Sequence, residues 1–124
     1  MPPLIVPRRP TILALLAALA ALSCSSAKDV GGQKAYGAEM ARRGFWREAL
    51  FRFEKAAAAS PDDSEIQNNL AVAYESLGET ANALAAYKRA LALAPNDAQI
   101  KRNYARFAEY YTSAQRASSP GTVP

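Results

Sequence analysis

The sequence predicts an all-α protein built from short helical repeats. Residues 34 positions apart have matching chemistry, and apolar residues fall at helical spacings. The matched pairs are Gly44 with Gly78, Ala49 with Ala83, Leu50 with Leu84, Phe53 with Tyr87, Ala56 with Ala90, Pro61 with Pro95 and Asp63 with Asp97. A fixed period of this length is typical of a solenoid that has one supersecondary unit per period. No segment of useful length alternates with period two, which argues against strands.

Each period divides into two helices. In the first unit, Tyr36, Gly37 and Met40 share a face of the first helix, and Gly44 supplies the flexible turn that follows. The second helix has an apolar face formed by Ala49, Leu50, Phe53, Ala56 and Ala57. We expect the alanines to let helices approach closely and Phe53 to fill the space between them.

The second unit repeats this pattern. Its two helices have apolar faces formed by Leu70, Ala71, Tyr74 and Leu77, and by Ala83, Leu84, Tyr87, Ala90, Leu91 and Leu93, with Gly78 between them. Pro61 and Pro95 end the second helix of each unit, because proline lacks a donor and clashes with the preceding turn. The predicted helix starts are Asp62 with Glu65 as a capping box, Asn96 with Gln99 likewise, and Thr80 as a cap.

A third unit is only half present. Tyr104 and Ala105 continue the register of the first helix, but no second half follows. Residues 98–115 are therefore expected to form a capping helix, whose outer face is kept solvated by Lys101, Arg102, Arg106 and Glu109. Residues 116–124 are expected to be a disordered tail. Two repeats are few for a solenoid, and self-association into a homo-oligomer that extends the stack is one way to compensate.

This pattern resembles the tetratricopeptide repeat. In that family a large residue, a small one and an aromatic are followed by Gly, Ala, an aromatic, Ala and Pro. The second unit matches at Leu70, Ala71, Tyr74, Gly78, Ala83, Tyr87, Ala90 and Pro95. The first unit differs only in having Met40 for an aromatic, and Trp46 also occupies a position that is often aromatic. The resemblance implies a short tetratricopeptide-repeat α-solenoid over 30–115, with repeats 30–63 and 64–97 and a capping helix 98–115.

The N-terminus has the features of a secretion signal. Arg8 and Arg9 precede the uncharged apolar run of residues 11–22, which is shorter than the roughly 20 residues of a spanning helix. Cys24, the only cysteine, follows Ser23. These residues resemble the lipobox of bacterial lipoproteins, which implies a signal peptide over 1–23 and a lipidated Cys24 with a tether over 24–29. An ordinary export signal cleaved near Ala21 or Ser23, and an uncleaved anchor helix, are the alternatives.

Composition argues against several classes of function. The chain has 15 Lys and Arg against 11 Asp and Glu, a net charge of +4 that is too mild and dispersed for a nucleic-acid surface. It has no histidine and one cysteine, so neither a His-ligated nor a Cys-cluster metal site can form. No phosphate-binding loop or nucleophile motif is present, and the Asp62-Asp63 pair is attributed to helix capping. We expect no enzyme activity, no cofactor and no nucleic-acid partner.

The resemblance places the binding surface on the concave face lined by the first helix of each unit. By register, the candidates for a peptide-binding groove are Lys34, Ala38, Arg42, Glu65, Asn68, Asn69, Val72, Glu75, Arg102 and Arg106. Lys34 and Asn69 match two positions of the clamp with which one subfamily grips a C-terminal carboxylate. Ala38, Gln99 and Asn103 occupy three positions where that clamp has other residues. We expect the basic groups to flank a groove for a segment carrying acidic groups.

These features together predict a membrane-anchored adaptor that binds a protein or peptide in the bacterial cell envelope. The lipid would attach the chain to the outer membrane, facing the periplasm, although the sequence does not distinguish the inner from the outer membrane. The alternatives are an accessory subunit of a cell-wall or secretion enzyme, and a self-assembling structural module. A small enzyme is disfavoured because no catalytic cluster is present.

Overall fold

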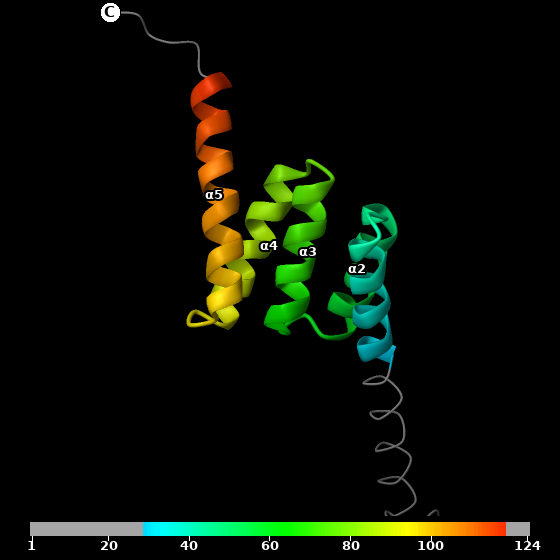
Figure 1. Ribbon diagram of the computed structural model, residues 1–124. Helices are drawn as coiled ribbons and strands as arrows, with labels where there is room; N and C mark the ends of the chain where they lie inside the picture. Colours follow the sequence, from blue (N-terminus) through cyan, green and yellow to red (C-terminus); the bar gives the residue numbers. More distant parts are fainter. Residues whose placement is uncertain (1–28, 119–124) are drawn as a thin grey trace, which may run out of the picture.

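The computed structural model describes residues 29–118, which form five helices and no strands. A helix over residues 29–42 is followed by α2 (Trp46–Ala59), α3 (Ser64–Ser76), α4 (Thr80–Leu93) and α5 (Ala98–Ser118). Figure 1 shows α2, α3, α4 and α5 side by side in one stack. We call helix 29–42, α3 and α5 the front helices, and α2 and α4 the back helices. This arrangement confirms the predicted short, all-α tetratricopeptide-type solenoid.

The turn within each repeat depends on its glycine. Gly44 and Gly78 have φ angles of 81° and 75°, in the left-handed region that favours glycine. Gly44 N donates to Ala41 O at 3.0 Å, and Phe45 N donates to Met40 O at 2.9 Å. The second turn repeats these two bonds, which satisfy carbonyls at the end of the preceding helix. The predicted helix breaks at Gly44 and Gly78 are confirmed.

The helix starts differ from the predicted ones by one residue. Asp63, rather than Asp62, accepts from the backbone N–H groups of Glu65 and Ile66, at 2.9 and 3.1 Å. A capping side chain must come immediately before the first helical residue, and α3 starts at Ser64. Asp62 instead forms an ion pair with Arg89 at 3.3 Å.

The other two predicted caps were also wrong. Asp97 takes the place expected for Asn96, accepting from the N–H groups of Gln99 and Ile100 at 2.8 and 2.9 Å. At α4 the N-cap residue is Glu79, which makes no side-chain capping bond. Thr80 is already inside α4, and its hydroxyl donates to Gly78 O.

The small residues of the repeat are buried at helix contacts, as predicted. Ala49, Ala56, Ala83 and Ala90 are all fully buried, and the rings of Phe53 and Tyr87 fill the space between helices. At Gly37 the packing leaves no room for a side chain, since a Cβ atom there would lie 2.7 Å from the Phe53 ring. The core continues into the capping helix through Phe107, whose ring lies 5.2 Å from that of Tyr87.

Three expectations fail at the ends of the stack. Tyr36 was expected in the core but is 47% exposed, with the Arg52 guanidinium 4.7 Å from its ring. Ala105 is also exposed. Both lie on terminal helices, where the described part of the chain supplies a packing partner on one side only. The capping helix extends to Ser118, so residues 116–118 are helical rather than part of a disordered tail.

Several predicted features lie outside the described residues. These are the signal peptide over 1–23, the lipidation site Cys24, the tether except Asp29, and the tail from 119 to 124. Asp29 itself is already helical. Within residues 29–118, no helix is long and apolar enough to cross a membrane.

Candidate protein-interaction surface

The predicted groove residues lie on the front helices, which the structure joins by polar contacts. Helix 29–42 contributes Lys34, Ala38 and Arg42; α3 contributes Glu65, Asn68, Asn69, Val72 and Glu75; α5 contributes Arg102 and Arg106. Three contacts cross from α3 to the other front helices: Lys34–Glu65, Asn68–Asn103 and Glu75–Arg106. We refer to this set of residues as the front face.

Lys34 is held by two carboxylates at the start of α3. Its Nζ lies 2.6 Å from Glu65 Oε2 and 3.8 Å from Asp63 Oδ2. The hydrogen bond to Glu65 raises the pKa of Lys34 above its usual range, against the opposing effect of partial burial. A carboxylate ligand at Lys34 would therefore have to displace or share this contact.

The two neighbouring asparagines of α3 have different roles. Asn68 is only 3% exposed, and its Oδ1 accepts from Asn103 Nδ2 at 3.0 Å. It therefore links α3 to α5 and offers a ligand almost no surface, contrary to the expectation that it lines a groove. Asn69 is half-buried, and its side-chain amide makes no hydrogen bond within residues 29–118.

Glu75 connects the front face to the core. Its Oε2 accepts from the Tyr87 hydroxyl at 2.7 Å and from Arg106 Nη2 at 3.3 Å. Burial, and then the hydrogen bond to Glu75, raise the pKa of Tyr87 far above its usual range. Tyr87 and Arg106 thus fix the Glu75 carboxylate, while Arg106 itself remains exposed.

The remaining candidates form the open parts of this surface. Val72 is half-buried near the middle of α3, and Ala38 packs against the core from helix 29–42. Arg42 is exposed and pairs with Glu39 of its own helix. Arg102 is exposed and makes no ion pair within the described part of the chain.

The electrostatics of the front face differ from the prediction. We expected basic groups to flank the groove. Lys34, Arg42 and Arg106 each have a carboxylate partner, and only Arg102 has none within the described part of the chain. The face therefore carries alternating, largely compensated charges, with an unpaired amide at Asn69. This arrangement offers hydrogen bonding and shape to a ligand, and little net attraction for an anion.

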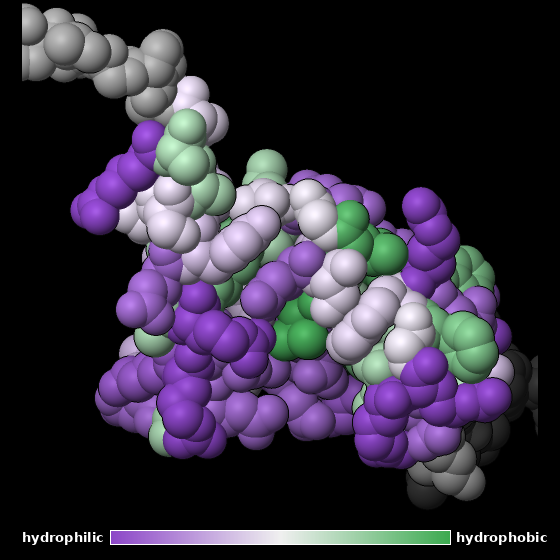
Figure 2. All heavy atoms as spheres, turned by 45° about the horizontal axis from the view of Figure 1, so that its top comes forward, coloured by the Kyte–Doolittle hydropathy of each residue, from purple (hydrophilic) through white to green (hydrophobic). Residues whose placement is uncertain are grey.

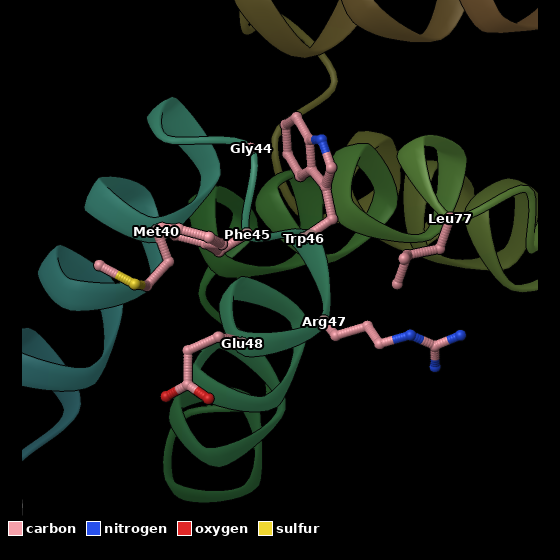
Figure 3. A pocket seen from close by; sticks show the side chains of 7 residues that line it. All are labelled: Met40, Gly44, Phe45, Trp46, Arg47, Glu48 and Leu77. Atoms are coloured by element: carbon pink, nitrogen blue, oxygen red, sulfur yellow. The ribbon is translucent and has the colours of Figure 1, made fainter.

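The turn of the first repeat borders a hollow that the sequence did not predict. It has a volume of about 560 Å³ and is lined by Met40, Phe45, Trp46, Arg47, Glu48 and Leu77, together with the turn glycine (Figure 3). The adjacent aromatics Phe45 and Trp46 directly after Gly44 were the available signal. Leu77 belongs to the next turn, so the sequence pattern of one repeat does not predict the hollow.

The described residues contain no cluster typical of a metal site. Over residues 29–118, no group of three or more His, Cys, Asp or Glu side chains could hold a metal ion. The carboxylates of the front face instead pair with lysine, arginine and tyrosine.

Comparison with known proteins identifies the class of this fold. Residues 64–97 match the tetratricopeptide repeat, so the chain contains a repeat of that kind. A solved structure of MamA AMB-1, in a P212121 crystal, has 26% sequence identity and a TM-score of 0.60. The similarity covers 72% of this chain and 49% of that one, so the match spans about half of MamA. A search of curated proteins found no match.

These findings indicate a protein-interaction module. Tetratricopeptide repeats generally bind protein partners and generally serve as non-catalytic scaffolds. The front face and the hollow at the first turn are then the surfaces to consider as docking sites.

Proposed function

We propose that this protein is a membrane-anchored adaptor of the bacterial cell envelope, which binds a segment of a partner protein on its front face. The observation that carries the binding site is the unpaired amide of Asn69. It lies beside Val72 on the central front helix, between the ion pairs Lys34–Glu65 and Arg106–Glu75.

The chemistry of this centre suits a peptide backbone. An asparagine amide has two donors and an acceptor, so it can pair with both the N–H and the C=O of an extended segment. Val72 adds an apolar contact next to it, half-buried and open to solvent. The two flanking ion pairs hold the three front helices in register, which pre-organises the surface and lowers the entropy cost of binding.

Crosslinking tests whether the front face is used. A photoreactive amino acid replaces Val72 in one variant and Lys88, on the exposed face of back helix α4, in another. Both variants are expressed in a bacterium and irradiated in intact cells. We expect a crosslinked partner from the Val72 position and none from the Lys88 position. The same partner at both positions, or only at Lys88, would overturn the assignment.

A matched pair of asparagines then tests the role of the amide. Asn69→Ala removes the unpaired amide, whereas Asn96→Ala removes an exposed amide in the turn before α5. Losing a hydrogen bond to a ligand costs about 1 kcal/mol, or roughly fivefold in affinity. We expect Asn69→Ala to weaken capture of the crosslinked partner and Asn96→Ala to leave it unchanged. Equal capture by both variants would show that Asn69 is not a ligand contact.

The anchoring part of the proposal is supported by sequence alone. The apolar run of residues 11–22 ends at Ser23-Cys24, and more than one acyl chain is needed for stable attachment. We expect mass spectrometry of the mature N-terminal peptide to show a lipid on Cys24, and Cys24→Ser to release the protein from the membrane fraction. A free Cys24 thiol or an intact leader would contradict this part without affecting the front-face experiments.

A further inference from the structure

The hollow at the first turn combines an apolar floor with an aromatic wall. Met40 is almost fully buried at its base, Phe45 is 52% exposed, and Trp46 and Leu77 are half-buried. In Figure 3 the Trp46 and Leu77 side chains stand on one side of the turn and Met40 and Phe45 on the other. Exposed aromatic side chains that border a concavity are typical of the anchor points of protein interfaces.

Two arginines lie at the rim of this hollow. The guanidinium of Arg43 lies 5.0 Å from the centre of the Phe45 ring, and Arg47 lines the hollow directly. Neither arginine forms an ion pair within residues 29–118. The nearby carboxylates are already paired. Glu48 pairs with Arg52 at 2.7 Å, and Glu39, which also attracts Arg43, pairs with Arg42. The rim therefore carries two arginines that have no ion-pair partner of their own among the described residues.

We propose that this hollow is a second docking site, separate from the front face, for an acidic segment of a partner protein that inserts one bulky apolar side chain. The apolar side chain would fill the space between Phe45, Trp46 and Leu77. Acidic residues flanking it would pair with Arg43 and Arg47, where the guanidinium group favours a carboxylate with two parallel hydrogen bonds.

The shape of the site favours a protein segment over a lipid surface. Arginine beside tryptophan also occurs at membrane surfaces, but a bilayer needs apolar groups that project outwards. Here Met40 lies at the base of a hollow of about 560 Å³, a volume in the range of ligand pockets. The view in Figure 2 likewise shows hydrophobic side chains set among hydrophilic ones, rather than a broad apolar face.

Trp46 is the only tryptophan of the chain, so its fluorescence reports on this hollow alone. The full chain is titrated with the capped synthetic peptide DEDLFDED, up to about 1 mM, the weak end of specific binding. The controls are DEDGSDED, which keeps the charges, and KRKLFKRK, which keeps the apolar pair. We expect a saturable blue shift of the Trp46 emission with DEDLFDED only.

Two matched pairs of variants locate the site. Phe45→Ala should abolish the shift, whereas Phe51→Ala, which removes a ring of similar exposure (46%) from the outer side of α2, should not. Arg43→Gln with Arg47→Gln should weaken binding by roughly tenfold, since two exposed ion pairs are lost. Lys88→Gln with Lys101→Gln removes the same charge from the exposed sides of α4 and α5 and should have no effect. All the replaced side chains are exposed, so circular dichroism should show every variant folded.

Several outcomes would overturn the proposal. A shift of equal size with KRKLFKRK or DEDGSDED would show that charge and apolar group are not both recognised. A shift with vesicles of phosphatidylglycerol but not with DEDLFDED would make a bilayer the occupant. A shift that depends on protein concentration without any peptide would make a second copy the occupant. An unchanged shift in Phe45→Ala would place the peptide elsewhere.

Discussion

Replacing Gly37 with alanine tests a close contact between helix 29–42 and α2. A Cβ atom at this position would lie 2.7 and 2.9 Å from two carbons of the Phe53 ring, and 3.1 Å from Arg52 Cβ. Phe53 is only 2% exposed, so its ring cannot swing into solvent to make room. Helix 29–42 and α2 would have to move apart or the ring would have to leave its rotamer.

Two opposing effects set the magnitude. Alanine is favoured over glycine in a helix by about 1 kcal/mol. Overpacking a filled core costs roughly 1–3 kcal/mol. The cost of the clash should exceed the gain in helix propensity, so we expect Gly37→Ala to lower the free energy of unfolding by about 1 kcal/mol. For a domain of this size, that corresponds to a fall of roughly 4–8 °C in the melting temperature.

Gly32 provides the matched control. It lies in the same helix, and a Cβ atom there would meet nothing within 4 Å. Gly32→Ala should therefore keep or raise stability, and the difference between the two variants isolates the clash. Urea unfolding followed by circular dichroism measures both. If Gly37→Ala were as stable as Gly32→Ala, the close packing of Gly37 on Phe53 would be refuted. In a double-mutant cycle, Phe53→Leu should recover part of the loss in Gly37→Ala.

Three further predictions follow from the core, the caps and the tyrosines. Ala90→Glu would place an unpaired charge at a fully buried position. It should lower the free energy of unfolding by several kcal/mol and abolish the helical circular dichroism. The exposed control Lys88→Ala should change stability by less than about 0.5 kcal/mol. Asp63→Ala and Asp97→Ala each remove a helix cap, so each should lower the free energy of unfolding, measured in urea, by about 1 kcal/mol. An equal loss of stability in Asp62→Ala would contradict the observed caps. Burial, and then the hydrogen bond to Glu54, raise the pKa of Tyr74 from 10.0 to about 12. The unfolded chain therefore releases this proton at lower pH than the folded chain does, and the free energy of unfolding should fall as the pH rises through that interval. Tyr74→Phe should make this fall shallower. An unchanged pH profile would show that Tyr74 does not contribute.

The parts of the fold that the sequence predicts are those set by periodic packing. Ala56, Ala90, Phe53 and Tyr87 recur at one spacing because each occupies the same place between helices, and all four are buried. The prediction fails where the surroundings of a repeat differ from its neighbours. Tyr36 has the register of a core residue, but its side chain is 47% exposed and its ring lies under the Arg52 guanidinium.

The polar contacts of the front face could not be predicted to the same degree. Lys34 meets Glu65, and Asn68 meets Asn103, across neighbouring helices; the paired residues are 31 and 35 positions apart in the chain. Such pairs depend on the rotation and offset of neighbouring helices at the scale of a side chain, which hydrophobic periodicity does not determine. The register correctly placed these residues on the front helices, and it could not show that one asparagine is buried and the other free.

The two candidate surfaces differ in how their charges are compensated. On the front face, Lys34 and Arg106 already have carboxylate partners, so a ligand there gains little from long-range attraction. At the hollow, Arg43 and Arg47 form no ion pair among the described residues, so an acidic ligand gains electrostatic contacts there. Salt screens exposed charges over a distance of about 8 Å at physiological ionic strength. Binding at the hollow should therefore weaken with added salt, while binding at the front face should depend mainly on the amide of Asn69 and the shape around Val72. One protein could then engage two partners, or two segments of one partner, through surfaces that ionic strength distinguishes.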